Sequence, residues 1–520
     1  MGVLMLKQKI IKETLIKRYF HKKIVPDAGF QNTESCIFRH SQEGYLTIAL
    51  ILILSAVLPL ILMMFTGAEK NGARMDSAYA YDASMDAILS EYNRELLKQY
   101  DVFFVDLSYG SGKPGTSSLD ARVMYYMNGN FTAKGNGIPT LTRTFYKMSA
   151  EGVKTNDVSI ATDDKGLVFR RQAEDFIADL DGFSLLSTKN LQKNAQKLEE
   201  KKDTIEEVNK KREKNKEKLE DLSSPGSDDD ENVGLLNAAN GISDLRDQAY
   251  AASGFLGFVT DLSKVSHMGF NGRMKPASMR KLQMGDGVNP ELFWEEGANR
   301  LLFFQYLAMK ASDFTHYEDK NAMKYQLEYV LKGSNDDYLN LRKTVTELVF
   351  LREAINSVYI FKDHDKVTLC KTIGAVIAVL CEDPQLEDAI KEFLLYTWAF
   401  VESLNDVKIL LSGKRLAIDK RGQNWQTSLW QILDPWHLPG GDGAESGGLS
   451  YRDHLIAMIF LQNIGTTTMR FLDMVEQDIR KVPGNSNFLI DQCADSFDIT
   501  VLTRSSTGDV FQETRRYGYP

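Results

Sequence analysis

The sequence has few of the residues that most often carry covalent or metal chemistry, with four cysteines and seven histidines among 520 residues. Cys36 precedes the one long apolar run, whereas Cys370, Cys381 and Cys493 follow it. An odd number of thiols beyond a membrane span does not make a disulfide framework, and we expect Cys370 and Cys381 to be small buried apolar side chains. No histidines have zinc-site spacing, and no G-x-S-x-G motif occurs. The sequence therefore predicts no catalytic residue, no metal site, no cofactor and no enzymatic activity.

The chain also lacks a basic face that would bind nucleic acid. Its formal net charge is −9. The whole chain has 62 basic and 71 acidic side chains, of which residues 1–44 hold eight basic and four acidic ones. The remaining 54 basic and 67 acidic side chains give the rest of the chain a net charge of −13. Phosphate binding requires the opposite sign, and this excess of acid excludes nucleic acid as an expected partner.

What the chain does have is one apolar run, Tyr45 to Thr66, without a charged residue. About 20 apolar residues cross the hydrocarbon core of a bilayer, so we expect a retained single-pass helix. Cleavage as a signal after Gly67 or Ala68 is the alternative that the sequence leaves open. Because basic flanks stay in the cytoplasm, we expect a cytoplasmic N-terminus, an extracellular C-terminal domain, and a cell-membrane location with the lipid bilayer as a partner.

An amphipathic pattern follows the run directly. Apolar residues recur at three- and four-residue intervals from Glu69 to Tyr100, which predicts one unbroken helix of about 55 residues from the start of the span. Pilin-like proteins begin with such a helix, although an ordinary juxtamembrane helix has the same pattern. A strand is expected at Val102 to Leu107. The glycines after it, Gly110, Gly112 and Gly115, are interpreted as a surface loop and not a nucleotide site, since no helix pattern opens directly after them.

The rest of the chain predicts a mainly α protein with a small antiparallel β-sheet, an α+β fold. Residues 141–171 alternate in polarity and predict short strands. Leu185 to Leu222 is expected to form a charged helix that pairs with a return helix from Leu235 to Leu262.

The expected organisation of the chain has six parts. They are a basic cytoplasmic tail (1–44), a transmembrane helix (45–66), a pilin-like helix with a small β-sheet (67–180), a charged helical hairpin (181–265) with an acidic linker (223–232), a helical bundle (289–482) and a C-terminal β-hairpin (483–520).

Within the bundle, helices are expected at 290–314, 319–332, 336–361, 365–381, 385–411 and 449–481. Two clusters resemble sites only superficially. Asp363, His364 and Asp365 are consecutive, which predicts a solvated turn and not a metal site, and Asp453 is expected to stabilise the first turn of a helix, next to His454. The tryptophans at 425, 430 and 436 fit either a glycan-binding surface or, as we expect, a packed core.

Four blocks of the sequence carry a family resemblance: EYNRELLKQYDVFFVD (91–106), QLEYVLKGSNDDYLNLRKTVTELVFLREAINSVYIF (326–361), TWAFVESLNDVKILLSGKRLAIDKRGQNWQTSL (397–429) and YRDHLIAMIFLQN (451–463). They resemble a domain-of-unknown-function family of single-pass surface proteins of Gram-positive bacteria. Its members are similar to TadE/TadG-type pseudopilins and accompany tight-adherence pilus machinery.

The resemblance implies a non-enzymatic, membrane-anchored structural or accessory component of a pilus or secretion apparatus, with other membrane proteins of that apparatus as partners. The alternative is a membrane-tethered ligand-binding or sensor ectodomain. The resemblance also suggests Gly44 and Tyr45 as a leader-peptidase site. The fifth residue after the cut would be Ala49, where pilins carry glutamate, so we expect the leader to be retained.

Overall fold

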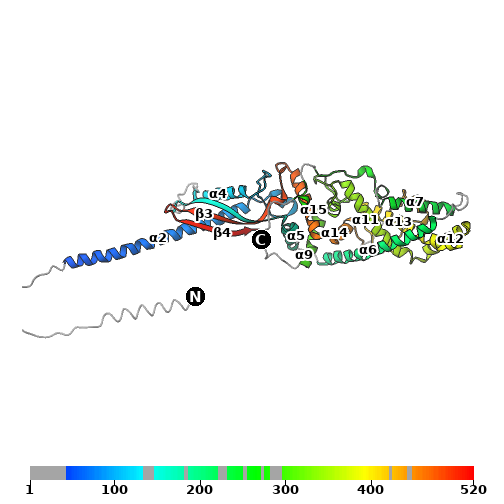
Figure 1. The fold of residues 1–520 in the computed structure, drawn as a ribbon, viewed down its shortest axis with the longest axis horizontal. Coiled ribbons are helices and arrows are strands. Elements are labelled where there is room, and N and C mark those ends of the chain that lie inside the picture. Colours follow the sequence, from blue (N-terminus) through cyan, green and yellow to red (C-terminus); the bar gives the residue numbers. More distant parts are fainter. Residues whose placement is uncertain are drawn as a thin grey trace, which may run out of the picture. The chain divides into compact units, whose positions relative to one another are not determined.

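The computed structural model describes residues 43–132, 146–180, 185–220, 231–249, 254–270, 275–280, 296–420, 424–441 and 448–519. The chain divides into two compact units, Met1–Ala68 and Glu69–Pro520. The expected fold class is confirmed, because the chain is mainly helical with a four-stranded antiparallel sheet, a long apolar N-terminal helix and a C-terminal β-hairpin (Figure 1). The finer division of the chain into segments stays a prediction.

The first unit contains the apolar half of helix α2 (Glu43–Leu89). Every side chain from Tyr45 to Thr66 is exposed, although most are large and apolar. These 22 residues span about 33 Å at 1.5 Å per residue, enough for a bilayer core. Pro59 lies inside the helix, as prolines in membrane helices can. Among the described residues, α2 is the one helix that is long and apolar enough to cross a membrane.

The expected unbroken helix to Tyr100 is wrong. Helix α2 ends at Leu89, and a separate helix α3 (Arg94–Tyr100) follows. The Asn93 side chain accepts a hydrogen bond from the backbone N–H of Glu95 at 3.0 Å, the N-cap arrangement that starts a new helix. An asparagine that bonds to the local backbone therefore interrupts a pattern whose apolar spacing looks continuous.

The sheet lies in the second unit and is built around strand β3 (Cys493–Arg504). Strand β2 (Ser149–Ile160) pairs antiparallel along one edge of β3, while β4 (Val510–Gly518) and the two-residue β1 (Val105–Asp106) pair along the other. The prediction that the C-terminal hairpin completes the sheet with an earlier strand is confirmed. The expected strand at Val102 to Leu107 is reduced to β1.

One face of this sheet is covered by the second half of α2 and by helix α4 (Ser117–Thr132), as Figure 1 shows. Alternate residues of β3 point into this core, as the two-residue period of a strand requires. The Tyr81 hydroxyl donates to the carbonyl of Ile499 at 2.6 Å, and the Ser77 and Thr503 hydroxyls are 2.7 Å apart. Polar bonds and apolar packing together attach α2 to the sheet.

The short strands expected over residues 141–171 are only partly correct. Strand β2 is a single 12-residue strand, and helix α5 (Asp163–Asp179) follows it. The turn predicted at residues 164–166 is present, with positive φ at all three residues, but it leads into a helix. Residues 141–145 lie outside the described residues.

The charged hairpin is confirmed as helices α6 (Leu185–Glu220) and α7 (Glu231–Gln248). Arg212 of α6 donates to the Ser243 hydroxyl of α7 at 2.9 Å. The return helix ends at Gln248, earlier than the expected Leu262. Most of the acidic linker, through residue 230, lies outside the described residues.

The remaining elements form a helical bundle. Its helices are α8 (Leu256–Val259), η2 (Leu262–Lys264), η3 (Ala277–Met279), α9 (Glu296–Lys310), α10 (Gln326–Lys332), α11 (Asp337–Ile360), α12 (His364–Leu380), η5 (Pro384–Leu386), α13 (Glu387–Leu411), η7 (Leu429–Leu433), α14 (Tyr451–Phe460), α15 (Ile464–Lys481) and η8 (Ile490–Gln492). Helix α13 is buried on nearly all sides and packs against α11, α12, α6 and α7. Most of its buried side chains are apolar, and the buried polar ones, such as Glu402 and Asp406, require partners inside the bundle.

The helix expected over residues 449–481 is two helices. Helix α14 ends at Phe460 and α15 begins at Ile464. Between them, the Asn463 side chain accepts a hydrogen bond from the backbone N–H of Thr466 at 3.1 Å. This is the second place where an asparagine N-cap divides a continuous apolar pattern.

Candidate functional site: a buried ion-pair network

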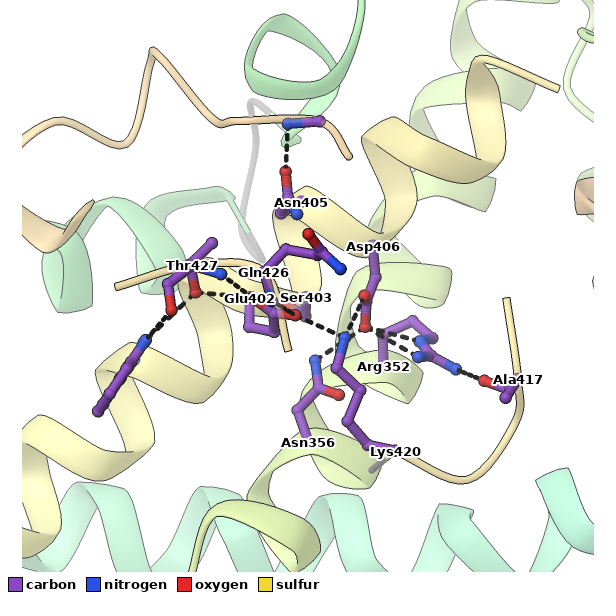
Figure 2. A network of polar contacts seen from close by, with 12 residues as sticks. Arg352, Asn356, Glu402, Ser403, Asn405, Asp406, Ala417, Lys420, Gln426 and Thr427 are labelled. Atoms are coloured by element: carbon purple, nitrogen blue, oxygen red, sulfur yellow. Dashed lines mark hydrogen bonds and ion pairs between the residues drawn. The ribbon is translucent and has the colours of Figure 1, made fainter. Parts of the chain in front are cut away.

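A network of buried polar side chains lies between helices α11 and α13 of the bundle (Figure 2). Arg352 and Asn356 are four residues apart on α11, and Glu402 and Asp406 are four residues apart on α13. This spacing places each pair on one face of its helix. Because the two helices pack together, the cationic face of α11 meets the anionic face of α13.

Asp406 contacts three other side chains of this network. Its Oδ2 accepts from Arg352 Nε at 3.0 Å, Arg352 Nη2 at 2.9 Å and Asn356 Nδ2 at 3.0 Å. Its Oδ1 accepts from Lys420 Nζ at 2.6 Å. Burial by itself would raise the pKa of Asp406, but the nearby charges of Arg352 and Lys420 outweigh it and hold the pKa below its usual value.

Glu402 binds the chain segment that follows α13. Its two carboxylate oxygens accept from the backbone N–H groups of Gln426 at 2.9 Å and Thr427 at 2.8 Å, and from the Thr427 hydroxyl at 2.6 Å. Lys420 Nζ lies 2.5 Å from the Glu402 carboxylate and thereby joins it to Asp406. Burial raises the pKa of Glu402, which has this one cation as partner.

The network is neutral and closed to solvent. Two cations, Arg352 and Lys420, balance two carboxylates, and their side chains are no more than 2 % exposed. The remaining Arg352 nitrogen, Nη1, donates to the Ala417 carbonyl at 3.0 Å. Complete pairing is what allows buried charges at all, since an uncompensated buried charge costs several kcal/mol.

A second buried ion pair lies one residue along α11. Arg246 of α7 donates from Nε and Nη2 to Glu353 Oε2 at 2.9 and 2.7 Å, and its guanidinium lies 4.8 Å from the Phe350 ring centroid. Asn215 of α6 donates to Glu392 of α13 at 2.9 Å. The contacts of Arg246 and Asn215 attach the two helices of the charged hairpin to α11 and α13. Arg212 and Asn215, two polar residues among the apolar positions of α6, are thus both bonded to neighbouring helices.

The polar groups of the network are engaged with one another inside the protein. Each of the four carboxylate oxygens of Glu402 and Asp406 accepts from an internal donor. Two open pockets of about 570 and 580 Å³ are lined by other residues. Within the described ranges, no group of three or more His, Cys, Asp or Glu side chains is placed to hold a metal ion. The network thus joins α11 and α13 to residues 417–420 and to residues 426 and 427.

The two residues that the sequence suggested as a processing site lie at the start of a helix. Gly44 and Tyr45 lie in the first turn of α2, and Tyr45 is 77 % exposed. The glycine loop is used internally: the N–H groups of Gly110, Gly112 and Gly115 donate to Asp106, Ser108 and Gln492 side chains. Helix α4 does open directly after this loop, contrary to expectation, but the loop amides are not free to bind phosphate.

The other suggested clusters have helix-terminal or packing roles. Asp363 is the N-cap of α12 and accepts from the backbone N–H of Lys366 at 3.2 Å; it is not simply part of a solvated turn. Asp453 forms a capping box with Ser450 at the start of α14, as its expected place in the first turn implies. His454 is fully buried, and burial lowers its pKa to about 4, so the imidazole is neutral near pH 7.

The three tryptophans do not form one cluster. Trp425 packs edge-on against Trp398 at 5.7 Å and its ring centroid is 5.7 Å from Lys420 Nζ, so it covers the network. Trp436 stacks on Phe258 at 3.8 Å, and Trp430 is 39 % exposed. The core interpretation is therefore correct for Trp425. Of the cysteines, Cys370 is buried, as expected, and Cys381 is partly buried; both are free thiols.

Comparison with known proteins gives one match, to a family of unknown function, DUF5702, over residues 237–505. This match covers more than half of the chain. The protein belongs to the DUF5702 family. The DUF5702 region begins inside α7 and reaches the end of β3, and therefore contains the whole ion-pair network. No curated protein and no solved structure gives a significant match.

The motifs and spacings of the sequence do not predict the network, although a signal for its anions is present. Within α13, which is largely apolar, Glu402 and Asp406 stand four residues apart, a spacing that places two carboxylates on one face of the helix. Of their two cations, Arg352 precedes both carboxylates by 50 residues or more, and Lys420 follows both by 14 residues or more. One helix can indicate the anions, but only the packing identifies Arg352 and Lys420 as their partners.

Proposed function

We propose that this DUF5702 protein is a non-enzymatic, membrane-anchored extracytoplasmic component of a tight-adherence-type pilus or secretion apparatus, built like a pseudopilin. The observation that carries the proposal is helix α2. Its first half presents an apolar, uncharged surface of membrane-spanning length, and its second half packs on an antiparallel sheet. Pilin-like proteins combine these two features, because the helix has to serve both the membrane and the folded domain.

The charge distribution supports the proposed orientation. Residues 1–44 carry an excess of basic side chains and the remainder a net charge of −13. Positively charged flanks are retained in the cytoplasm, which supports a location of residues from Gly67 onward outside the cell membrane. Other membrane proteins of the apparatus are the expected partners, and the bilayer holds the span.

The closed network supports a structural role over an enzymatic one. Its carboxylates already accept from Arg352, Lys420 and backbone N–H groups, and such fully satisfied networks rigidify a core. A rigid, helix-rich domain on a membrane anchor is suited to docking in an assembly.

Deletion of the protein in its native cell tests the proposal. We expect surface filaments or secretion to be lost, to return with the full chain, and not to return with a chain in which Ile53, Leu54 and Leu58 are replaced by lysine to prevent membrane insertion. A chain in which three exposed polar residues of α6 are replaced by lysine serves as the control, and it should restore filaments or secretion. Unchanged filaments and unchanged secretion after deletion would contradict the proposal.

The state of the leader distinguishes an accessory protein from a filament subunit. The glutamate that pilins carry at the fifth position is replaced by Ala49, so we expect Gly44 and Tyr45 to remain joined. N-terminal sequencing of the native protein checks this, and a new N-terminus at Tyr45 would make the chain a processed filament subunit.

A second candidate, a membrane-tethered ligand-binding or sensor ectodomain, draws on a different observation. An open pocket of about 580 Å³ lies beside the sheet, lined by aromatic and acidic side chains. Its volume is in the usual range for small-ligand sites.

A further inference from the structure

The pocket beside the sheet has an unusual combination of side chains. It lies where the end of α2, the segment after α3, helix α5 and the C-terminal residues meet. Four of its lining residues are aromatic and four are aspartates, and none is basic: Tyr92, Phe103, Phe176 and Tyr519, with Asp86, Asp101, Asp175 and Asp179. We refer to it as the acidic aromatic pocket.

The aromatic wall is held in place with part of its surface open. Phe103 is 39 % exposed, yet Gln172 accepts from its backbone N–H at 2.7 Å and donates to its carbonyl at 2.9 Å. The Phe103 ring contacts Tyr92 at 5.3 Å and Tyr519 at 5.6 Å between centroids. Since these contacts anchor the ring, its exposure is a fixed property of the pocket, and it offers an apolar surface to an occupant.

The negative charge of the pocket is only partly compensated. Asp101 pairs with Lys310, and Asp175 lies 3.7 Å from Arg171. Asp86 and Asp179 are exposed and have no cationic partner within the described part of the chain. The carboxylates therefore exclude an anionic occupant, and the aromatic rings between them favour an organic cation over a bare metal ion.

The chain itself shows how an ammonium group is received at this pocket. Lys310 Nζ lies 5.2 Å from the ring centroid of Phe176 and forms its ion pair with Asp101. Lys310 itself lines the other open pocket, but Asp101 and Phe176 show that a carboxylate and an aromatic face of this chain hold an ammonium together. The acidic aromatic pocket offers the same pair of groups in Phe103 and Tyr92 with Asp86 and Asp179.

We propose that the acidic aromatic pocket binds an alkylammonium group on an apolar stem, the chemistry of a lysine side chain. The stem lies against Phe103, and the ammonium is held by Asp86 and Asp179. This inference deepens the ligand-binding candidate and does not depend on the pilus role, since filament loss after deletion and ligand binding by the purified protein are measured separately.

Calorimetric titration of the full chain in lipid nanodiscs tests the proposal with matched probes. The peptides are acetyl-Phe-Lys-amide and acetyl-Phe-norleucine-amide, which differ by the ammonium alone, and the small molecules are n-pentylamine and 1-pentanol. We expect each amine to bind about tenfold or more tightly than its neutral analogue. Binding by both amines assigns the site to the ammonium and its stem, whereas binding by the peptide alone assigns it to polypeptide-borne lysine. Equal affinity of amine and neutral analogue would overturn the proposal.

Substitutions locate the binding within the pocket. We expect Asp179→Asn and Asp86→Asn each to weaken amine binding about three- to tenfold, and Phe103→Leu, which keeps apolar bulk but removes the ring, to weaken it about two- to fivefold. Asp365→Asn, an exposed aspartate on α12, is the matched control and should leave affinity unchanged. Unfolding temperatures of all four variants within a few degrees of wild type verify the fold. Unchanged affinity in both Asp86→Asn and Asp179→Asn would contradict the assignment.

Discussion

At the scale of single residues, the bundle depends on charges that are buried and fully paired. Arg352 meets Asp406 with two nitrogens at 3.0 and 2.9 Å, and both side chains are at most 1 % exposed. Removing one partner leaves the other charge without compensation, which is far more costly than losing a surface ion pair. The pairing therefore makes the structure sensitive to change at either residue.

Replacing Arg352 by methionine is expected to reduce the free energy of unfolding by about 3–5 kcal/mol, because Asp406 loses its main cation. The double variant Arg352→Met with Asp406→Asn should lose clearly less than the sum of the single losses, since it restores neutrality beside Lys420 and Glu402. Urea unfolding of the four proteins measures this coupling. Arg504→Met, which removes an exposed ion pair with Glu151, is the control at about 0–1 kcal/mol. Additive losses would show that the pair is not coupled.

Glu328 predicts a pH dependence of stability. Burial and then the nearby charge of Asp313 raise the pKa of Glu328 from 4.5 to about 8. Between these values the folded chain keeps a proton that the unfolded chain releases, so this residue lowers stability as pH rises from about 4.5 to about 8, at up to about 1.4 kcal/mol per pH unit. Above pH 8 its contribution is constant.

Glu328→Gln should remove this pH dependence, because glutamine does not ionise. In the wild-type protein the Tyr451 hydroxyl donates to Glu328 Oε1 at 3.0 Å, and the amide oxygen of glutamine can accept the same hydrogen bond. We expect the free energy of unfolding of the variant, relative to that of the wild type, to increase as the pH is raised from 5 to 9. Urea unfolding of both proteins at each pH measures this difference. Parallel pH profiles for the two proteins would contradict the raised pKa.

At the scale of elements, two helices approach each other through a glycine. Gly166, at the start of α5, has φ of +83°, and a Cβ there would lie 2.5 Å from the Thr468 methyl group of α15. Only glycine combines this backbone conformation with so close a contact. The contact joins α5, which follows β2, to the helix that precedes the final strands.

Gly166→Ala is expected to destabilise the protein by about 2 kcal/mol or more, from backbone strain and overpacking together. Gly129→Ala is the matched control, since Gly129 lies within α4 with nothing near its Cβ position, and alanine there should stabilise by about 0.5–1 kcal/mol. Thermal unfolding of both variants checks the opposite signs. A similar unfolding temperature for both variants would contradict this packing.

At the scale of the whole molecule, the apolar half of α2 predicts a single crossing of the membrane. A phosphatase that is active only outside the cytoplasm should be active when fused after residue 120 and inactive when fused after residue 30. The positive-inside distribution of the flanking residues is the physical reason. Replacing the basic residues of 1–44 by neutral ones should reduce activity of the residue-120 fusion, and activity of the residue-30 fusion would overturn the orientation.

Local patterns were sufficient for the elements that depend on local physics. The apolar helix α2, the charged helices, most of the bundle helices and the final β-hairpin follow from apolar periodicity and turn residues, which act over neighbouring positions. The same patterns failed at Asn93 and Asn463, where a side chain caps a new helix, and after the turn at residues 164–166, which continues as α5. At those places, a few hydrogen bonds outweigh the apolar pattern.

By itself, the sequence determined that a mainly helical protein would form, with one run long and apolar enough to span a membrane and a small antiparallel sheet, because the spacing of apolar residues within each segment decides which face is buried. Tertiary structure alone decided that Arg352 and Lys420 neutralise Glu402 and Asp406, and that Phe103 stays exposed beside four aspartates. These groups come from distant segments, and their charges and surfaces meet only when the helices pack. Pairing across the fold depends on geometry that no single segment contains.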